Sequence, residues 1–94
     1  MFEITREDSG TVVLNGRLDA ASAGEARHFL DEIQSTCRLD FSGLDYMASV
    51  GLGLLAAVQK RLMAHGDGLI LAGLSPHLRE VLSLAGFEGI FEFE

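Results

Sequence analysis

The sequence is poor in the residues that mark several specialised classes of protein. Its 94 residues include one cysteine, one proline and no tryptophan. Cys37 cannot form an internal disulfide, and this indicates a reducing compartment. The longest apolar stretch, residues 51–58, is far shorter than the roughly 20 residues that a membrane-spanning helix needs. Residues 1–8 lack the basic and apolar regions of a signal peptide. We therefore expect a cytoplasmic protein with no direct membrane insertion.

Basic residues are also scarce. Seven Lys and Arg stand against fourteen Asp and Glu, which gives a formal net charge of −7. Nucleic-acid binding depends mainly on Lys and Arg that neutralise phosphates, so this balance argues against a nucleic-acid partner. It argues equally against an anionic membrane surface. A basic protein partner is compatible with the charge, although solubility is its commoner meaning.

The sequence carries no recognisable catalytic or metal-binding motif. His28, His65 and His77 lie in three separate segments, without carboxylates or a thiol at metal-ligand spacing. Cys37 opens a strand-like segment, where an inert buried thiol is expected. There is no phosphate-binding loop, and the glycines at 51 and 53 fall inside an apolar helical pattern. We therefore expect no enzyme activity, no metal and no cofactor.

The composition and periodicity that are present predict a packed α/β domain. Apolar residues make up 48% of the chain, enough for one modest core at this length, so we expect residues 1–94 to form a single domain. Alternation and apolar runs predict strands, whereas a spacing of three to four predicts helices. The predicted strands are residues 2–6, 11–15, 37–41, 69–72 and 89–93, and the predicted helices are residues 20–33, 49–63 and 76–85.

This order, ββαβαβαβ, also predicts a topology. Helices that alternate with strands imply parallel connections, while Asp8-Ser9-Gly10 supplies a turn between the first two strands. The predicted fold is a mixed, mostly parallel sheet with an amino-terminal β-hairpin and about three helices. The last helix has the clearest limits, with Ser75 as N-cap, Pro76 at the first helical position and Gly86 just past the end.

Residues 40–53 stand out because they run from a strand through an expected loop into a helix. Ser49 lies where that helix is predicted to begin. One hypothesis makes Ser49 an N-cap worth about 1 kcal/mol. The other makes it a phosphorylation site, since a phosphate there would meet free N–H groups and the positive end of the helix dipole. Such a phosphate would add about −1.5 to −2 charges to the surface while leaving the fold unchanged.

Three segments resemble the STAS family (sulphate transporter and anti-sigma factor antagonist). Gly16-Arg17-Leu18-Asp19 is similar to the family's Gly-x-Leu-Asp element after the second strand. Residues 39–44, followed by residues 49–53, resemble its central strand and switch loop. Residues 74–87 resemble its closing Ser-Pro helix. The three segments together cover almost the whole chain in the family's order.

The resemblance implies roles for individual residues. In anti-sigma factor antagonists of the family, the switch loop typically reads Asp-Ser-Ser/Thr-Gly-Leu, and its first hydroxyl residue is the phospho-acceptor. Ser49 matches that acceptor, whereas Ala48 replaces the aspartate and Val50 replaces the second hydroxyl residue. The residues that the resemblance assigns to partner binding are Asp19, Ala48, Val50, Gly51 and Leu52.

The resemblance also implies the partner. A kinase-type anti-sigma factor would phosphorylate Ser49 and would bind only the unphosphorylated protein; ATP would belong to that partner, and a phosphatase is a further candidate partner. The alternatives are a subunit of an ABC lipid transporter that docks on its ATPase, or a scaffold without phosphorylation. We expect a monomer or weak homodimer. The carboxy-terminal helix of many family members is expected to be missing, which would leave part of one sheet face uncovered.

Overall fold

The computed structural model describes residues 1–87 and 89–94. The described chain forms five strands and three helices in the predicted order ββαβαβαβ. In sequence they are β1 (Phe2–Arg6), β2 (Val12–Leu18), α1 (Ala23–Leu30), β3 (Cys37–Met47), α2 (Ser49–Met63), β4 (Leu69–Ala72), α3 (Pro76–Leu84) and β5 (Glu92–Phe93). Among the described residues, no helix is long and apolar enough to span a membrane.

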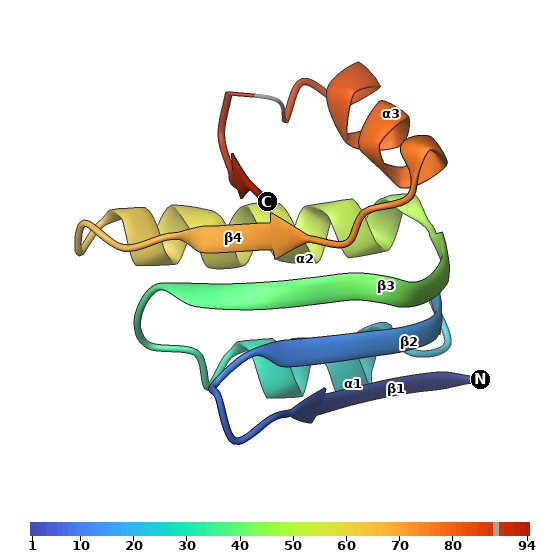
Figure 1. Ribbon diagram of the computed structural model, residues 1–94, viewed down its shortest axis with the longest axis horizontal. Helices are drawn as coiled ribbons and strands as arrows, with labels where there is room; N and C mark the ends of the chain where they lie inside the picture. Colours follow the sequence, from blue (N-terminus) through green and yellow to red (C-terminus); the bar gives the residue numbers. More distant parts are fainter. Residues whose placement is uncertain (88) are drawn as a thin grey trace.

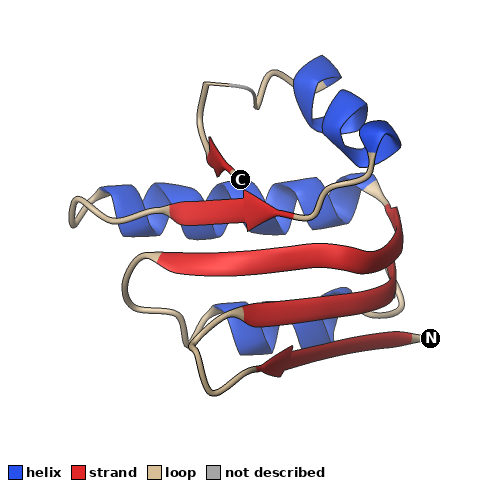
Figure 2. Cartoon of the chain, viewed as in Figure 1, coloured by secondary structure: helices blue, strands red, loops and turns tan. Residues whose placement is uncertain are grey.

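The strands form one sheet in the order β1-β2-β3-β4-β5. β1 pairs with β2 in antiparallel orientation, and every later pair is parallel, which confirms the predicted mixed, mostly parallel sheet. Figure 1 shows α1 and α2 behind the sheet and α3 beyond β4. In Figure 2, α1 and α2 therefore form one layer and the sheet forms a second layer in front of them. The core lies between these layers, with fully buried leucines from both.

The other face of the sheet carries no helix in the described part of the chain, as Figure 1 shows. That face is largely polar. Arg38 forms an ion pair with Glu94, and Asp40 lies two residues farther along the same strand. Because strand residues alternate between faces, these side chains lie opposite the core residues Leu39 and Phe41. The polarity of this face lets it remain in contact with water.

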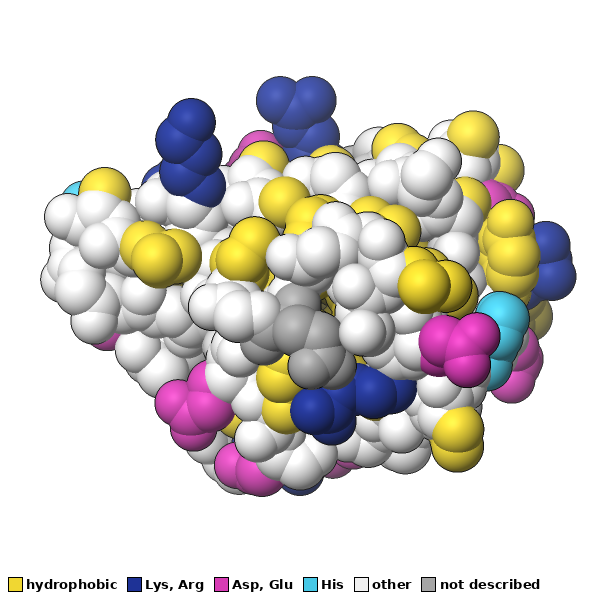
Figure 3. Space-filling model, turned by 90° about the horizontal axis from the view of Figure 1, so that it is seen from above, with side chains coloured by type: hydrophobic (Ala, Val, Ile, Leu, Met, Phe, Trp, Pro, Cys, Tyr) yellow, Lys and Arg dark blue, Asp and Glu magenta, His cyan; other side chains and the backbone are white. Residues whose placement is uncertain are grey.

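Hydrophobic exposure is concentrated elsewhere. Seen from above, hydrophobic side chains emerge over α2 and α3 (Figure 3). The most exposed large ones on these helices are Met63 and Leu84, the latter 81% exposed. Leu84 lies off the apolar stripe that buries Leu78 and Leu82, so the helix turns it towards solvent.

The predicted end of the third strand is wrong, because β3 continues to Met47 instead of ending at residue 41. Two bulges explain the difference. From Val13 to Asn15, β2 advances two residues while β3 advances three. A second extra residue in β3 lies just before Tyr46. Gly43 permits the first irregularity, since a Cβ there would collide with the Asn15 side chain. The glycine and the broken alternation made this part of β3 resemble a loop.

Two other elements are shorter than predicted. The helix predicted at residues 20–33 spans only Ala23–Leu30, because the preceding residues form a hydrogen-bonded turn and the N–H groups of residues 32 and 33 bond three residues back, in a tighter turn. The strand predicted at 89–93 is limited to Glu92–Phe93, which pairs with Ile70 and Leu71; residue 88 lies outside the described residues.

The limits of α3 are confirmed in detail. The Ser75 side chain accepts a hydrogen bond from the Leu78 N–H at 3.1 Å, and Pro76 occupies the first helical position. Gly86 has a φ of 82°, the left-handed conformation that ends many helices.

Asp40 stabilises the first bulge of β3, and this leads to a prediction. Its Oδ1 accepts hydrogen bonds from the Ser42 N–H at 2.9 Å and the Ser42 hydroxyl at 2.8 Å, and these bonds lower the pKa of Asp40. We expect Asp40→Asn to lower the free energy of unfolding by about 1 kcal/mol at neutral pH, because hydrogen bonds to a charged acceptor are stronger. Urea unfolding followed by circular dichroism would measure the change.

The pH dependence of this effect has a defined sign. A folded pKa below the unfolded value stabilises the protein above the unfolded pKa of about 3.9, and this contribution is lost as the pH falls. The difference between wild type and Asp40→Asn should therefore shrink as the pH falls from about 5 towards 2. Asp8→Asn, in an exposed turn, serves as control. A difference that is the same at every pH would contradict the role given to the Asp40 charge.

Candidate functional site

The carboxyl ends of β2 and β3 bring the predicted site residues together. Leu18 pairs with Met47 at the last rung of this parallel ladder. The Ala48 N–H then donates a hydrogen bond to the Leu18 carbonyl oxygen at 2.8 Å. Asp19 therefore leaves one strand beside the point where Ser49 leaves the other. Residues thirty positions apart in the sequence become neighbours at this end of the sheet.

Ser49 is the first residue of α2 and is exposed. The N-cap position belongs to Ala48, whose backbone is extended (φ −80°, ψ 167°) and whose side chain makes no capping hydrogen bond. The hypothesis that Ser49 caps the helix is therefore wrong. Its neighbour Val50 is also exposed, with 38% of its surface accessible. The start of α2 thus presents a hydroxyl and an apolar side chain together.

Gly51 contributes to the site through packing. It is buried, and a Cβ on it would lie 2.7 Å from Met47 Cγ and 2.9 Å from Leu18 Cδ2. The absence of a side chain lets the first turn of α2 lie close to the ends of β2 and β3. Leu52 is half-buried and packs against the core, so it offers only part of its side chain to a partner.

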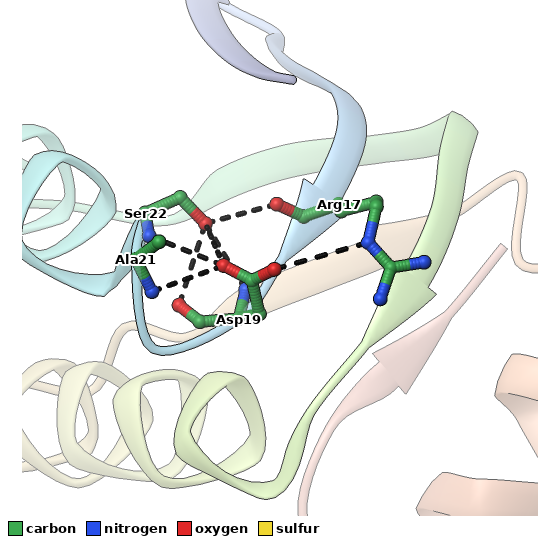
Figure 4. Close-up of polar contacts among 4 residues, drawn as sticks. All are labelled: Arg17, Asp19, Ala21 and Ser22. Carbon is green, nitrogen blue, oxygen red and sulfur yellow. Dashed lines mark hydrogen bonds and ion pairs between the residues drawn. The ribbon is translucent and has the colours of Figure 1, made fainter.

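Asp19 holds the turn between β2 and α1 (Figure 4). Its Oδ1 accepts hydrogen bonds from the N–H groups of Ala21, at 3.0 Å, and Ser22, at 3.3 Å. The buried Ser22 hydroxyl donates to the Arg17 carbonyl oxygen at 2.9 Å and accepts from the Asp19 N–H at 3.0 Å. One carboxylate oxygen is thus committed to the local structure. The other, Oδ2, faces Arg17.

Arg17 and Tyr46 are site residues that the sequence did not reveal. They are paired across β2 and β3, and the Arg17 guanidinium carbon lies 4.3 Å from the centre of the Tyr46 ring. Arg17 Nε lies 3.8 Å from Asp19 Oδ2 (Figure 4). The pairing depends on the second bulge of β3, which no local pattern indicates. A cation–π contact of this kind contributes about 0.5–1 kcal/mol at an exposed site.

Among residues 1–87 and 89–94, the remaining chemistry-bearing side chains are not grouped into a second site. Cys37 is buried at the opposite end of β3, and burial raises the pKa of its thiol, which disfavours the reactive thiolate. His28, His65 and His77 are exposed in separate elements. Within the described residues, no three His, Cys, Asp or Glu side chains are grouped so as to hold a metal ion.

Comparison with known proteins identifies the family. The family model described as "Mlab, STAS domain" matches residues 2–92, almost the whole chain. The chain therefore belongs to the STAS domain family.

Similar proteins bear related names. BtrV of Bordetella bronchiseptica, named as an anti-sigma factor antagonist, is 35% identical over 82 residues, covering 83% of this chain and 71% of BtrV. The anti-sigma-B factor antagonist of Listeria monocytogenes is 29% identical over 99 residues, covering 99% of this chain and 87% of the relative.

Solved structures share the fold. The Bacillus cell fate determinant SpoIIAA in its phosphorylated form is 25% identical, with a TM-score of 0.71; the match covers 100% of this chain and 91% of that one. An anti-sigma factor antagonist from Mycobacterium paratuberculosis is 23% identical, with a TM-score of 0.79, over 99% of this chain and 83% of that one. This second likeness bears on the fold alone.

The two glycines at the start of α2 provide a matched pair for a prediction. We expect Gly51→Ala to lower the free energy of unfolding by about 1–3 kcal/mol, because the new methyl group would overlap Leu18 and Met47. Gly53→Ala should stabilise by up to about 1 kcal/mol, since open space surrounds Gly53 and alanine favours the helix. Thermal and urea unfolding would measure both. Equal effects of the two substitutions would contradict the packing role of Gly51.

Proposed function

We propose that this protein is an anti-sigma factor antagonist. It binds a kinase-type anti-sigma factor, and phosphorylation of Ser49 controls that binding. The observation that carries the proposal is the exposed Ser49 hydroxyl at the first residue of α2, next to the exposed Val50. The names of the relatives from Bordetella bronchiseptica and Listeria monocytogenes support the same role. The protein acts by binding, and ATP belongs to its partner.

The position of Ser49 suits a phosphate that must not disturb the fold. The first N–H groups of a helix have no acceptor within the helix and lie at the positive end of its dipole. The first turn of α2 contains no acidic side chain, so a phosphate there meets no like charge from its own helix. A favourable interaction of about 0.3–1 kcal/mol is typical of an anion at this position.

The same phosphate changes what a partner meets. The unmodified surface combines the hydroxyl of Ser49 with the apolar side chains of Ala48, Val50 and Leu52, bordered by Asp19. About −1.5 to −2 added charges would repel an acidic group on the partner and would have to be desolvated on docking. Binding is therefore lost through the interface while the fold remains.

A second function, a transporter subunit that docks on an ATPase, is favoured by two residues. Ala48 and Val50 stand where the antagonist motif has an aspartate and a second hydroxyl residue. These replacements remove the carboxylate that could orient the acceptor or pair with a cation of the kinase. In this function Ser49 stays unmodified, and the apolar start of α2 binds the ATPase constitutively.

Intact-mass measurement of the protein from its native cells tests the proposal directly. We expect a species about 80 Da heavier, as one phosphate requires, with the added mass mapped to Ser49. Cells should be sampled in growth and under stress, because a switch changes its occupancy with conditions. Absence of the added mass under every condition would overturn the antagonist function and favour the transporter subunit.

A pair of substitutions tests the consequence of phosphorylation. Ser49→Asp should weaken binding to the co-purifying anti-sigma factor by more than tenfold, or about 1.4 kcal/mol, because it places a negative charge in the interface. Ser49→Ala should bind as tightly as wild type and should not gain phosphate. Isothermal titration calorimetry would give the affinities. Equal binding by wild type and both variants would rule out a switch at Ser49.

A further inference from the structure

The guanidinium of Arg17 is held in place beside the proposed switch. Its face lies over the Tyr46 ring at 4.3 Å, and its Nε lies 3.8 Å from Asp19 Oδ2. Asp19 is itself fixed by the N–H groups of Ala21 and Ser22. The Arg17 side chain nevertheless remains 55% exposed. An aromatic face and a fixed carboxylate thus orient a cation that stays open to solvent.

In the described part of the chain, the hydrogen-bonding capacity of this guanidinium is unused. A separation of 3.8 Å is too long for a hydrogen bond, so the carboxylate attracts Arg17 without accepting from it. Across residues 1–87 and 89–94, no group accepts a hydrogen bond from the Arg17 side chain. Five N–H donors in a rigid fork are therefore available to an incoming group. Such a fork matches the paired oxygens of a carboxylate or a phosphate.

The location of Arg17 connects it with the switch. Arg17 and Tyr46 occupy one rung of the ladder, and Leu18 and Met47 occupy the next. The Leu18 carbonyl oxygen then accepts from the N–H of Ala48, the residue before Ser49. A partner that covers Ser49 must approach this end of the sheet, where Arg17 is exposed.

We infer that Arg17 is a recognition residue that binds an oxyanion of the partner, either a carboxylate of the protein or a phosphate of its bound nucleotide. The inference rests on the proposed function, since it assigns a contact within the same interface. Tyr46 and Asp19 are the positioning residues, because they fix the guanidinium plane before the partner arrives. Lysine would keep the charge but lose the fork and much of the stacking.

The test uses phosphorylation by the native kinase. Dephosphorylated wild type and Arg17→Met, Arg17→Lys and Arg27→Met variants are incubated with ATP and desalted lysate of the native cells. Mass spectrometry then gives the initial rate of phosphate addition to Ser49. Arg27 is a matched control, because it is exposed and forms a comparable 3.9 Å ion pair with Asp31, away from the switch on α1.

We expect Arg17→Met to slow phosphorylation at least tenfold, Arg17→Lys to fall between it and wild type, and Arg27→Met to match wild type. If a higher concentration of the variant restores the rate, the contact is a carboxylate that contributes to docking. If the loss persists at saturating variant, the contact is a nucleotide phosphate.

The remaining outcomes separate the two proposals. Arg17→Met that is phosphorylated as fast as wild type overturns the inference and leaves the proposed function standing. Arg27→Met as slow as Arg17→Met also overturns it, because a general charge effect would then explain the loss. Wild type that gains no phosphate overturns the proposed function itself, and the inference with it. Urea unfolding of each variant establishes that all are folded.

Discussion

The parallel pairing of β2 with β3 is the constraint on which the site depends. It places Leu18 opposite Met47 and fixes the Ala48 N–H on the Leu18 carbonyl oxygen. The first turn of α2 then lies close against both strand ends, where a side chain at position 51 would force Met47 and Leu18 to shift. Because the two strands end together, Asp19 and Ser49 emerge side by side. Without the two bulges in β3, the strand would end out of step with β2 and present different side chains.

The residues at this end of the sheet divide between those that the fold holds in place and those that stay exposed. Gly51 and one oxygen of Asp19 are committed to packing and to the turn before α1. Ser49 and Val50 are exposed in the first turn of α2. A surface built in this way can be changed chemically without unfolding the protein. This division suits a binding protein, whose exposed residues are free to match a partner.

The sequence predicted correctly those helix limits that are set by residues within one turn of the helix end. Ser75, Pro76 and Gly86 each act within one helix turn, so the limits of α3 could be read directly from the sequence. Ser49 was placed correctly at the start of a helix for the same reason. The extension of β3 could not be predicted from the sequence, because each bulge interrupts the alternation that identifies a strand. Gly43 is also a residue typical of turns. The contact between Arg17 and Tyr46 could not be predicted either, since these residues pair only because of the second bulge in β3.

The charge around the proposed switch explains why a single phosphate could be decisive. The protein already carries a net charge of −7, and the acidic groups near the end of β3 include the exposed Asp45 and the half-buried Asp19. In that setting the helix dipole offsets a phosphate on Ser49 by only about 0.3–1 kcal/mol. This interaction with the helix dipole is sufficient to leave α2 intact. It is too small to cancel the repulsion that about two negative charges would exert on an acidic group of an approaching protein. Arg17, held by Tyr46, is the cation closest in the ladder to this surface, so in the proposed interface the balance between attraction and repulsion would depend on very few side chains. Under the proposed function, a small domain with one core would change partners without a conformational change, because the energy that decides binding would lie in exposed charges that folding does not need.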